Sequence, residues 1–243
     1  MLGCLILLIN TKHHNKIITF GLSFASSVMF LISILDLMPE GIEFINNYFN
    51  KIPSIIICLI TITIGVIISS IFNKLIPENN NLYKIGIISM IAIILHNIPE
   101  GIATFMTTSN NIKLGLKLTI AIAIHNIPEG ISIALPIFYS TQNKKKAILY
   151  TLISALSEPF GALIAYLFLT PIINNLFLGI LFSFIAGIMI YISTYELFPT
   201  AIKYKYYKII FISILFGTII VILNLIMFNS FIINIKHPYS ICL

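Results

Sequence analysis

Apolar runs, most of them close to twenty residues long, follow one another along the chain and are separated by short polar loops that carry lysines. A helix of about 20 apolar residues crosses the hydrocarbon core of a bilayer. Only 9% of the residues are charged, whereas about a quarter are charged in soluble domains. The sequence therefore excludes an ordinary soluble domain and predicts an all-α, polytopic membrane helical bundle.

The apolar runs predict eight helices in a single domain that covers residues 1–243. The first run, 1–10, has about half the length that a span needs and lacks the basic start and the cleavage site of a signal peptide. We expect it to be the end of a first helix, shortened in nature or by a misplaced start codon. The other helices are predicted at 16–38, 53–72, 84–107, 114–139, 147–169, 172–199 and 208–235.

The lysines predict how the bundle is oriented, because cytoplasmic loops carry an excess of Lys and Arg. When alternate loops are grouped, one side carries Lys12, Lys16, Lys74, Lys84, Lys144, Lys145, Lys146, Lys203, Lys205 and Lys208. The other side carries Lys51, Lys113, Lys117 and Lys236. We therefore expect the first side to face the cytoplasm and the C-terminus to lie outside a bacterial plasma (inner) membrane. The lysines explain the net charge of +6, so no nucleic-acid partner is expected.

Two copies of the hexamer HNIPEG, at His96–Gly101 and His125–Gly130, lie in the middle of apolar runs. Each residue of an α-helix advances by about 100°, so the His, Glu and Asn of one hexamer share an arc of about 100° with the glutamate in the middle. Imidazole and carboxylate groups suit a divalent ion such as Zn²⁺ or Fe²⁺, and a glutamate in this position can bridge two ions. The candidate ligands are His96, Asn97, Glu100, His125, Asn126 and Glu129.

Five of the eight acidic residues lie inside or at the ends of predicted spans: Asp36, Glu100, Glu129, Glu158 and Glu196. An ionised side chain at the centre of a membrane helix costs about 2.5–3.5 kcal/mol, so the three deepest acids together cost on the order of 8–10 kcal/mol. No lysine lies at the same depth to pair with them. This arrangement favours a bound cation as the compensating charge.

Glu158 shares a helix face with small residues that favour close helix contact, namely Thr151, Ser154, Ala155, Ala162 and Ala165. This face is expected to bring Glu158 to the metal site; the alternative is a carboxyl group kept protonated or hydrogen-bonded within the bundle. Asp36 and Glu196 each stand three residues before a proline, in DLMP and ELFP. They are predicted either to mark the ends of a metal pathway or to cap helix ends, and their similarity suggests an internal repeat.

These motifs resemble those of the Zrt/Irt-like (ZIP) metal transporters, and in particular of the bacterial ZupT-type branch. The resemblance is carried by HNIPEGIATF from His96, AIAIHNIPEGISIALP from Ala121, LISILDLMPE from Leu31, SALSEPFGALIAYL from Ser154 and AGIMIYISTYELFP from Ala186. It extends over nearly the whole chain. It implies an eight-helix transporter with both termini outside the cell and a binuclear metal site between the fourth, fifth and sixth helices.

The resemblance also implies residue roles. One metal position would be formed by His96, Glu100, His125 and Glu129, and the second by Asn97, Asn126 and Glu158 with Glu100 and Glu129 as bridges. Asp36 takes the place of an acid in the second helix that is associated with metal choice or entry. The chain departs from the family pattern in its shortened first helix, and its loop NKLIPENNNLYK lacks the histidine-rich segment of many eukaryotic members.

The expected function is uptake of divalent transition metals into the cytoplasm, zinc first, with Fe²⁺, Mn²⁺ and Co²⁺ compatible with the same ligands. No prosthetic group is expected. The expected partners are the transported cations and the lipid bilayer, and a homodimer stays open. An intramembrane metal-dependent hydrolase is the main alternative, but it would need a metal-bound water and usually a general base, and the chain has no HExxH motif. A selective metal channel is a third hypothesis, and no enzyme activity is expected.

Overall fold

The computed structural model describes residues 1–8, 13–75, 81–110, 112–169 and 174–236. Every element in these residues is helical, which confirms the all-α prediction. In chain order they are η1 (Leu2–Leu8), α1 (His14–Ile32), η2 (Ser33–Leu37), α2 (Met38–Asn46), α3 (Lys51–Leu75), α4 (Asn81–Asn110), α5 (Ile112–Thr141), α6 (Lys144–Ile164), η3 (Ala165–Leu169), α7 (Asn175–Tyr191), η4 (Ile192–Leu197), α8 (Phe198–Lys203) and α9 (Tyr207–Lys236). η1 is a 3₁₀ helix, and η2, η3 and η4 are π-helical turns.

Several of these elements continue directly into the next, so the described residues form eight helical segments. α1, η2 and α2 make one segment, α6 and η3 another, and α7, η4 and α8 a third. Among the described residues, six segments are long and apolar enough to cross a membrane: His14–Asn46, Lys51–Leu75, Leu82–Ile102, Lys144–Leu167, Asn175–Lys203 and Tyr207–Ile226. The protein is therefore a multi-pass membrane protein, as the apolar runs predict.

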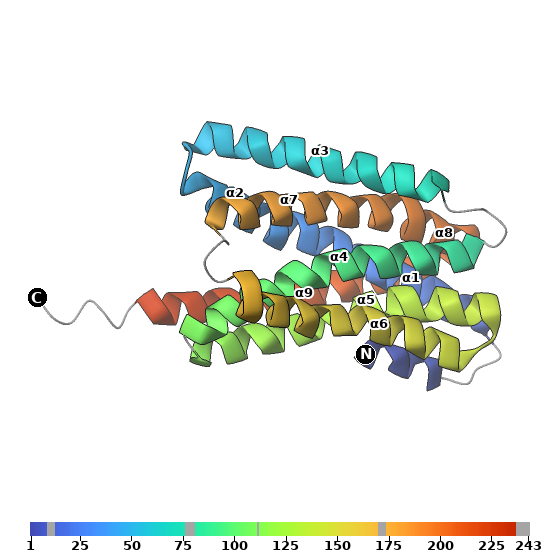
Figure 1. The fold of residues 1–243 in the computed structure, drawn as a ribbon. Helices are drawn as coiled ribbons and strands as arrows, with labels where there is room; N and C mark the ends of the chain where they lie inside the picture. The colour runs from blue at the N-terminus through green and yellow to red at the C-terminus, as the bar shows by residue number, and fades with distance from the viewer. Residues whose placement is uncertain (9–12, 76–80, 111, 170–173, 237–243) are drawn as a thin grey trace, which may run out of the picture.

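Figure 1 shows the helices lying alongside one another, with α3 along one edge of the bundle and the N-terminal η1 near α6 at the opposite edge. α4 packs against both α5 and α6, α3 packs against α7, and α1 packs against α9. The largest cluster of buried apolar side chains joins α1, α4, α5 and α7. The two hexamer helices and the helix that carries Glu158 therefore form one group of neighbours.

Glycines set the spacing between α4 and α6. A Cβ atom at Gly101 would collide with the carbonyl oxygen of Glu158, and a Cβ atom at Gly161 would collide with a backbone carbonyl of α4. Small residues allow such backbone contact between membrane helices. The same kind of contact joins α3 to α7 through Gly65 and Gly187. The small-residue face predicted for the α6 segment did not include Gly161, where the two backbones meet.

Two π turns interrupt α-helical segments at the motifs DLMP and ELFP. The Met38 N–H donates to the carbonyl oxygen of Ser33 in η2, and the Phe198 N–H donates to that of Ser193 in η4, five residues back in each case. A proline follows each donor and supplies no N–H of its own. The two motifs thus adopt the same local backbone structure, which is what an internal repeat would produce. Such π turns occur frequently at functional sites.

Candidate metal site

α4 and α5 bring three of the predicted ligands together inside the bundle. The Nε2 atom of His96 lies 3.8 Å from Oε2 of Glu100, one turn along α4, and 3.4 Å from Oε1 of Glu129 on α5. The three residues are buried, with 2%, 8% and 3% of their surface exposed, respectively. Two atoms bound at about 2.1 Å to one tetrahedral ion lie roughly 3.4 Å apart. His96 and Glu129 therefore have the spacing of two ligands of one metal ion.

The repeat predicts His125 as a fourth ligand at this position. His125 lies on α5, but its side chain is outside the part of the chain that the structure describes. Among the described side chains, no group of three His, Cys, Asp or Glu residues could hold a metal ion as it stands. The prediction of a four-ligand position therefore stays a prediction.

The two asparagines of the hexamers are held through their amide nitrogens. Asn97 Nδ2 donates to the carbonyl oxygen of Ser154 at 3.1 Å, and Asn126 Nδ2 donates to Oε2 of Glu158 at 3.0 Å. The Oδ1 atoms of both asparagines are shielded from solvent and accept no hydrogen bond from the described residues. Asparagine binds cations through this oxygen. Both side chains are thus held in a way that keeps the ligating atom available.

Two cavities adjoin these side chains. The smaller has a volume of about 30 Å³ and is lined by Asn97, Asn126 and Glu129 together with small and apolar residues. A cavity needs about 10–15 Å³ to hold one water molecule, so this space has room for one or two water-sized ligands. The larger has a volume of about 250 Å³ and is lined by Asn126, Glu158 and mainly apolar residues of the N-terminus, α5 and α6. Asn126 therefore lies at the wall between the two spaces.

The position of Glu158 follows from the close contact between α4 and α6. Gly101 ends the first hexamer, and its lack of a side chain allows the Glu158 carbonyl oxygen to lie against α4. From there the Glu158 carboxylate accepts the hydrogen bond from Asn126 on α5. The site thus links three helices, because His96 and Glu129 join α4 to α5, and Asn126 and Glu158 join α5 to α6.

The two candidate pathway acids lie in the π turns, with Asp36 half-buried in η2 and Glu196 buried in η4. Oε1 of Glu196 accepts a hydrogen bond from Nδ2 of Asn73 on α3, and the same nitrogen donates to the Tyr191 hydroxyl at 2.9 Å. The sequence did not identify Asn73, because the predicted helix 53–72 ends just before it, whereas α3 continues past it. An amide at the end of an apolar run is the signal that could have found it.

The sequence profile of the ZIP zinc transporter family matches residues 76–225, which is more than half of the chain. The chain belongs to the ZIP zinc transporter family. The resemblance seen in its motifs is therefore confirmed. The matched stretch includes both hexamers of this ZIP protein, together with Glu158 and Glu196.

Several bacterial relatives match this ZIP protein along most of its length. Zinc transporter ZupT of Streptococcus mutans is 35% identical over 235 residues, which cover 90% of this chain and 89% of the relative. Zinc transporter ZupT of Clostridium perfringens is 34% identical, over 93% of this chain and 91% of the relative. Zinc transporter ZupT of Campylobacter jejuni is 36% identical, over 84% and 83%. The similarity to the ZupT branch of the ZIP family thus extends well beyond the two hexamers.

Proposed function

We propose that this ZIP protein takes up zinc ions across the membrane through a site formed by α4, α5 and α6. The observation that carries the proposal is the 3.4 Å approach of the buried His96 Nε2 to the buried Glu129 Oε1, which joins the two hexamers. Imidazole and carboxylate groups are zinc ligands, and carboxylates at membrane depth need a neutralising partner. The relatives named as zinc transporters support zinc as the first substrate.

The proposed site holds two ions. The first is bound by His96, Glu100, His125 and Glu129. The second is bound by Asn97, Asn126 and Glu158, with Glu100 and Glu129 as bridges. The hydrogen bonds made by both amide nitrogens support the second position, since they leave the amide oxygens for the metal.

The chemistry of these ligands suits a site that must also release its ion. Imidazole and carboxylate groups bind metal in their deprotonated forms, so protons leave as the ion binds, and protonation favours release. The site has weak carboxylate and amide ligands in place of a closed cage of thiolates. Its nitrogen and oxygen ligands also accept Fe²⁺, Mn²⁺ and Co²⁺, which we propose as further substrates.

The lysines support the proposed orientation of the bundle, and the ZIP family supports uptake as the direction of transport. The end of the bundle where α8 finishes at Lys203 carries the excess of lysines, so this end faces the cytoplasm. The C-terminus then lies on the opposite, outer side of the inner membrane. Glu196 in η4 lies toward this end, and Asp36 in η2 lies toward the other. Asp36 is therefore the acid on the entry side and Glu196 the acid on the exit side. A homodimer is compatible with this arrangement.

Zinc uptake by the purified protein in liposomes tests the proposal. We expect radioactive zinc to accumulate inside the vesicles at a rate that saturates as the zinc concentration rises, with Fe²⁺, Mn²⁺ and Co²⁺ competing for entry. Protein-free liposomes are the control. Flux that rises without saturation would instead favour a channel, and the absence of any zinc movement would contradict the proposed function.

Replacing Asn73 with leucine tests whether the Glu196 carboxylate must be held in place. The change removes the donor to Glu196 and to the Tyr191 hydroxyl, and losing a partner of a buried polar group costs about 1–3 kcal/mol. We expect a lower free energy of unfolding and slower zinc uptake. Thr63→Leu is the matched control, because Thr63 is exposed on the same helix and its hydroxyl donates only to its own helix, at Leu59. Equal uptake by the two variants would show that transport does not require this hydrogen bond to hold the Glu196 carboxylate.

A further inference from the structure

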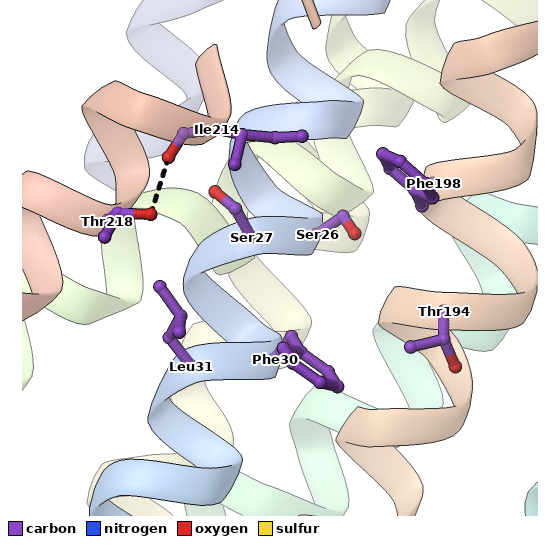
Figure 2. A pocket seen from close by; sticks show the side chains of 8 residues that line it. All are labelled: Ser26, Ser27, Phe30, Leu31, Thr194, Phe198, Ile214 and Thr218. Atoms are coloured by element: carbon purple, nitrogen blue, oxygen red, sulfur yellow. Dashed lines mark hydrogen bonds between the residues drawn. The ribbon is translucent and has the colours of Figure 1, made fainter. Parts of the chain in front are cut away.

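A groove of about 240 Å³ lies between α1, α9 and the turn from η4 into α8. Figure 2 shows Phe30 and Leu31 of α1 at one end of the groove, and Phe198 of α8 and Ile214 of α9 toward the other. None of the predicted metal ligands lines it. Its content is therefore a separate question from the metal site.

The side chains that line the groove leave no hydroxyl hydrogen for a ligand. Its four hydroxyl groups all donate to backbone carbonyl oxygens, from Ser26 to Ser193 (2.9 Å), from Ser27 to Phe24 (2.9 Å), from Thr194 to Ile190 (2.6 Å) and from Thr218 to Ile214 (2.9 Å). The last of these bonds is drawn in Figure 2. No charged residue lines the groove. An occupant would therefore contact mainly methyl, methylene and phenyl groups, which suits an apolar molecule.

The groove is continuous with surface that faces lipid. α9 contains a candidate membrane span, and large apolar side chains next to the groove are exposed on it, including Phe211, Leu215 and Ile219. In a membrane such surface is covered by acyl chains. The groove lies between this face of α9 and the η4–α8 turn. The apolar molecules present at such a surface are the acyl chains of lipids.

Lysines stand beyond one end of the groove. Lys203 lies five residues after Phe198 and Lys208 lies six residues before Ile214, which at 1.5 Å per helical residue places them about 8–9 Å along their helices from the groove. Lys203, Lys205 and Lys208 are all exposed. Juxtamembrane lysines attract anionic lipid headgroups. The three lysines can therefore bind the phosphate of such a lipid, and the apolar groove can hold its acyl chain.

We propose that this groove binds one acyl chain of an anionic phospholipid whose phosphate lies at Lys203, Lys205 and Lys208. The bound chain packs against η4, the same π turn that carries Glu196. The lipid site is defined by residues outside the metal site. Lipid binding can therefore be measured independently of zinc transport, and its failure would not affect the proposed function.

The chain contains no tryptophan, so a single introduced tryptophan reports on one position. Phe30→Trp places an indole in the groove, and Leu223→Trp places one on the open lipid-facing surface of α9, fifteen residues from Lys208. Each variant is reconstituted in vesicles that contain a minor fraction of phosphatidylglycerol with brominated chains, or the same fraction of brominated phosphatidylcholine. We expect the brominated anionic lipid to compete for the groove at least about fivefold better than the zwitterionic one, the preference that a single nearby lysine gives. We expect little difference at Leu223→Trp.

Two further changes separate the chain site from the headgroup site. Thr218→Leu or Thr194→Leu fills the groove, so the quenching at Phe30→Trp should fall to the level of the open surface. Lys205→Asn combined with Lys208→Gln should remove the preference for the anionic lipid while chain quenching persists; asparagine tolerates the positive φ of 61° at Lys205. Three results at Phe30→Trp would each overturn the proposal. Equal quenching by both lipids would indicate ordinary lipid contact, and quenching by aqueous acrylamide would indicate a water-filled groove. Shielding from acrylamide that disappears when the protein is diluted would indicate that a second copy of the chain covers the groove.

Discussion

Replacing Glu129 with alanine is expected to lower zinc uptake by at least about tenfold. Mutating a residue that only supports a metal ligand already lowers metal affinity or activity by about tenfold or more, and Glu129 is a proposed ligand itself. Glu129 is 3% exposed and lies 3.4 Å from His96 across the two hexamer helices, and it is one of the two proposed bridges between the ions. Its loss removes a ligand from each position. Uptake of radioactive zinc into proteoliposomes measures the effect, and calorimetric titration of the detergent-solubilised protein should show fewer zinc ions bound per chain.

Two companion variants make this result specific. Glu129→Gln keeps the size of the side chain and removes its charge, so it should behave like the alanine variant if the carboxylate binds metal. Glu43→Ala removes an exposed acid of α2 and should transport normally. If Glu129→Ala retained wild-type uptake at equal protein in the membrane, the assignment of Glu129 as a ligand would be wrong.

Replacing Gly161 with alanine is expected to lower the free energy of unfolding by about 1–3 kcal/mol, the usual cost of overpacking a tight interior, and to slow zinc uptake as well. The added Cβ atom would collide with the carbonyl oxygen of Ile98 on α4. Because backbone must move to relieve this contact, α6 shifts and carries Glu158 away from Asn126. Thermal unfolding in detergent measures the first effect, and proteoliposome uptake measures the second.

Gly21→Ala provides the comparison for this experiment. The atoms nearest to a Cβ at Gly21 belong to the side chains of Leu135 and Ile131, and the closest is a terminal methyl of Leu135 that can rotate away. We therefore expect a small loss of stability and normal uptake. Gly101→Ala should resemble Gly161→Ala, because its Cβ atom meets the Glu158 carbonyl from the other side of the same contact. Indistinguishable stability and uptake for Gly161→Ala and Gly21→Ala would show that the α4–α6 spacing does not position the site.

Much of the fold and part of the site follow from local patterns. The apolar runs predict a multi-pass helical bundle because few other structures can bury so many apolar residues. The helical repeat places His96 beside Glu100, and the structure has them 3.8 Å apart. Predicted membrane depth marks Glu129 and Glu158 as acids that need a partner. These properties depend on residues close in sequence or on the surrounding solvent, so no knowledge of the packing is required.

Contacts between distant residues were not predictable in this way. The sequence does not reveal that Asn73 reaches Glu196, because these residues belong to α3 and η4, and neither helix encodes the rotation of the other. Nor does it show which amide atom of Asn97 or Asn126 is left for a metal ion. That depends on the Ser154 carbonyl and the Glu158 carboxylate of α6, which accept hydrogen bonds from the two amide nitrogens.

The sequence by itself determined that this protein is a bundle of membrane helices, and it predicts a matching His-Asn-Glu face on two of them, because hydropathy and the helical repeat act within each segment. Only the tertiary structure decided that α6 approaches α4 at Gly101 and Gly161, and that α1, α9 and the η4–α8 turn form a groove with a mainly apolar lining. The physical reason is that helix packing in a membrane depends on the fit of whole surfaces and on close backbone contact, and these arise only once the helices stand side by side.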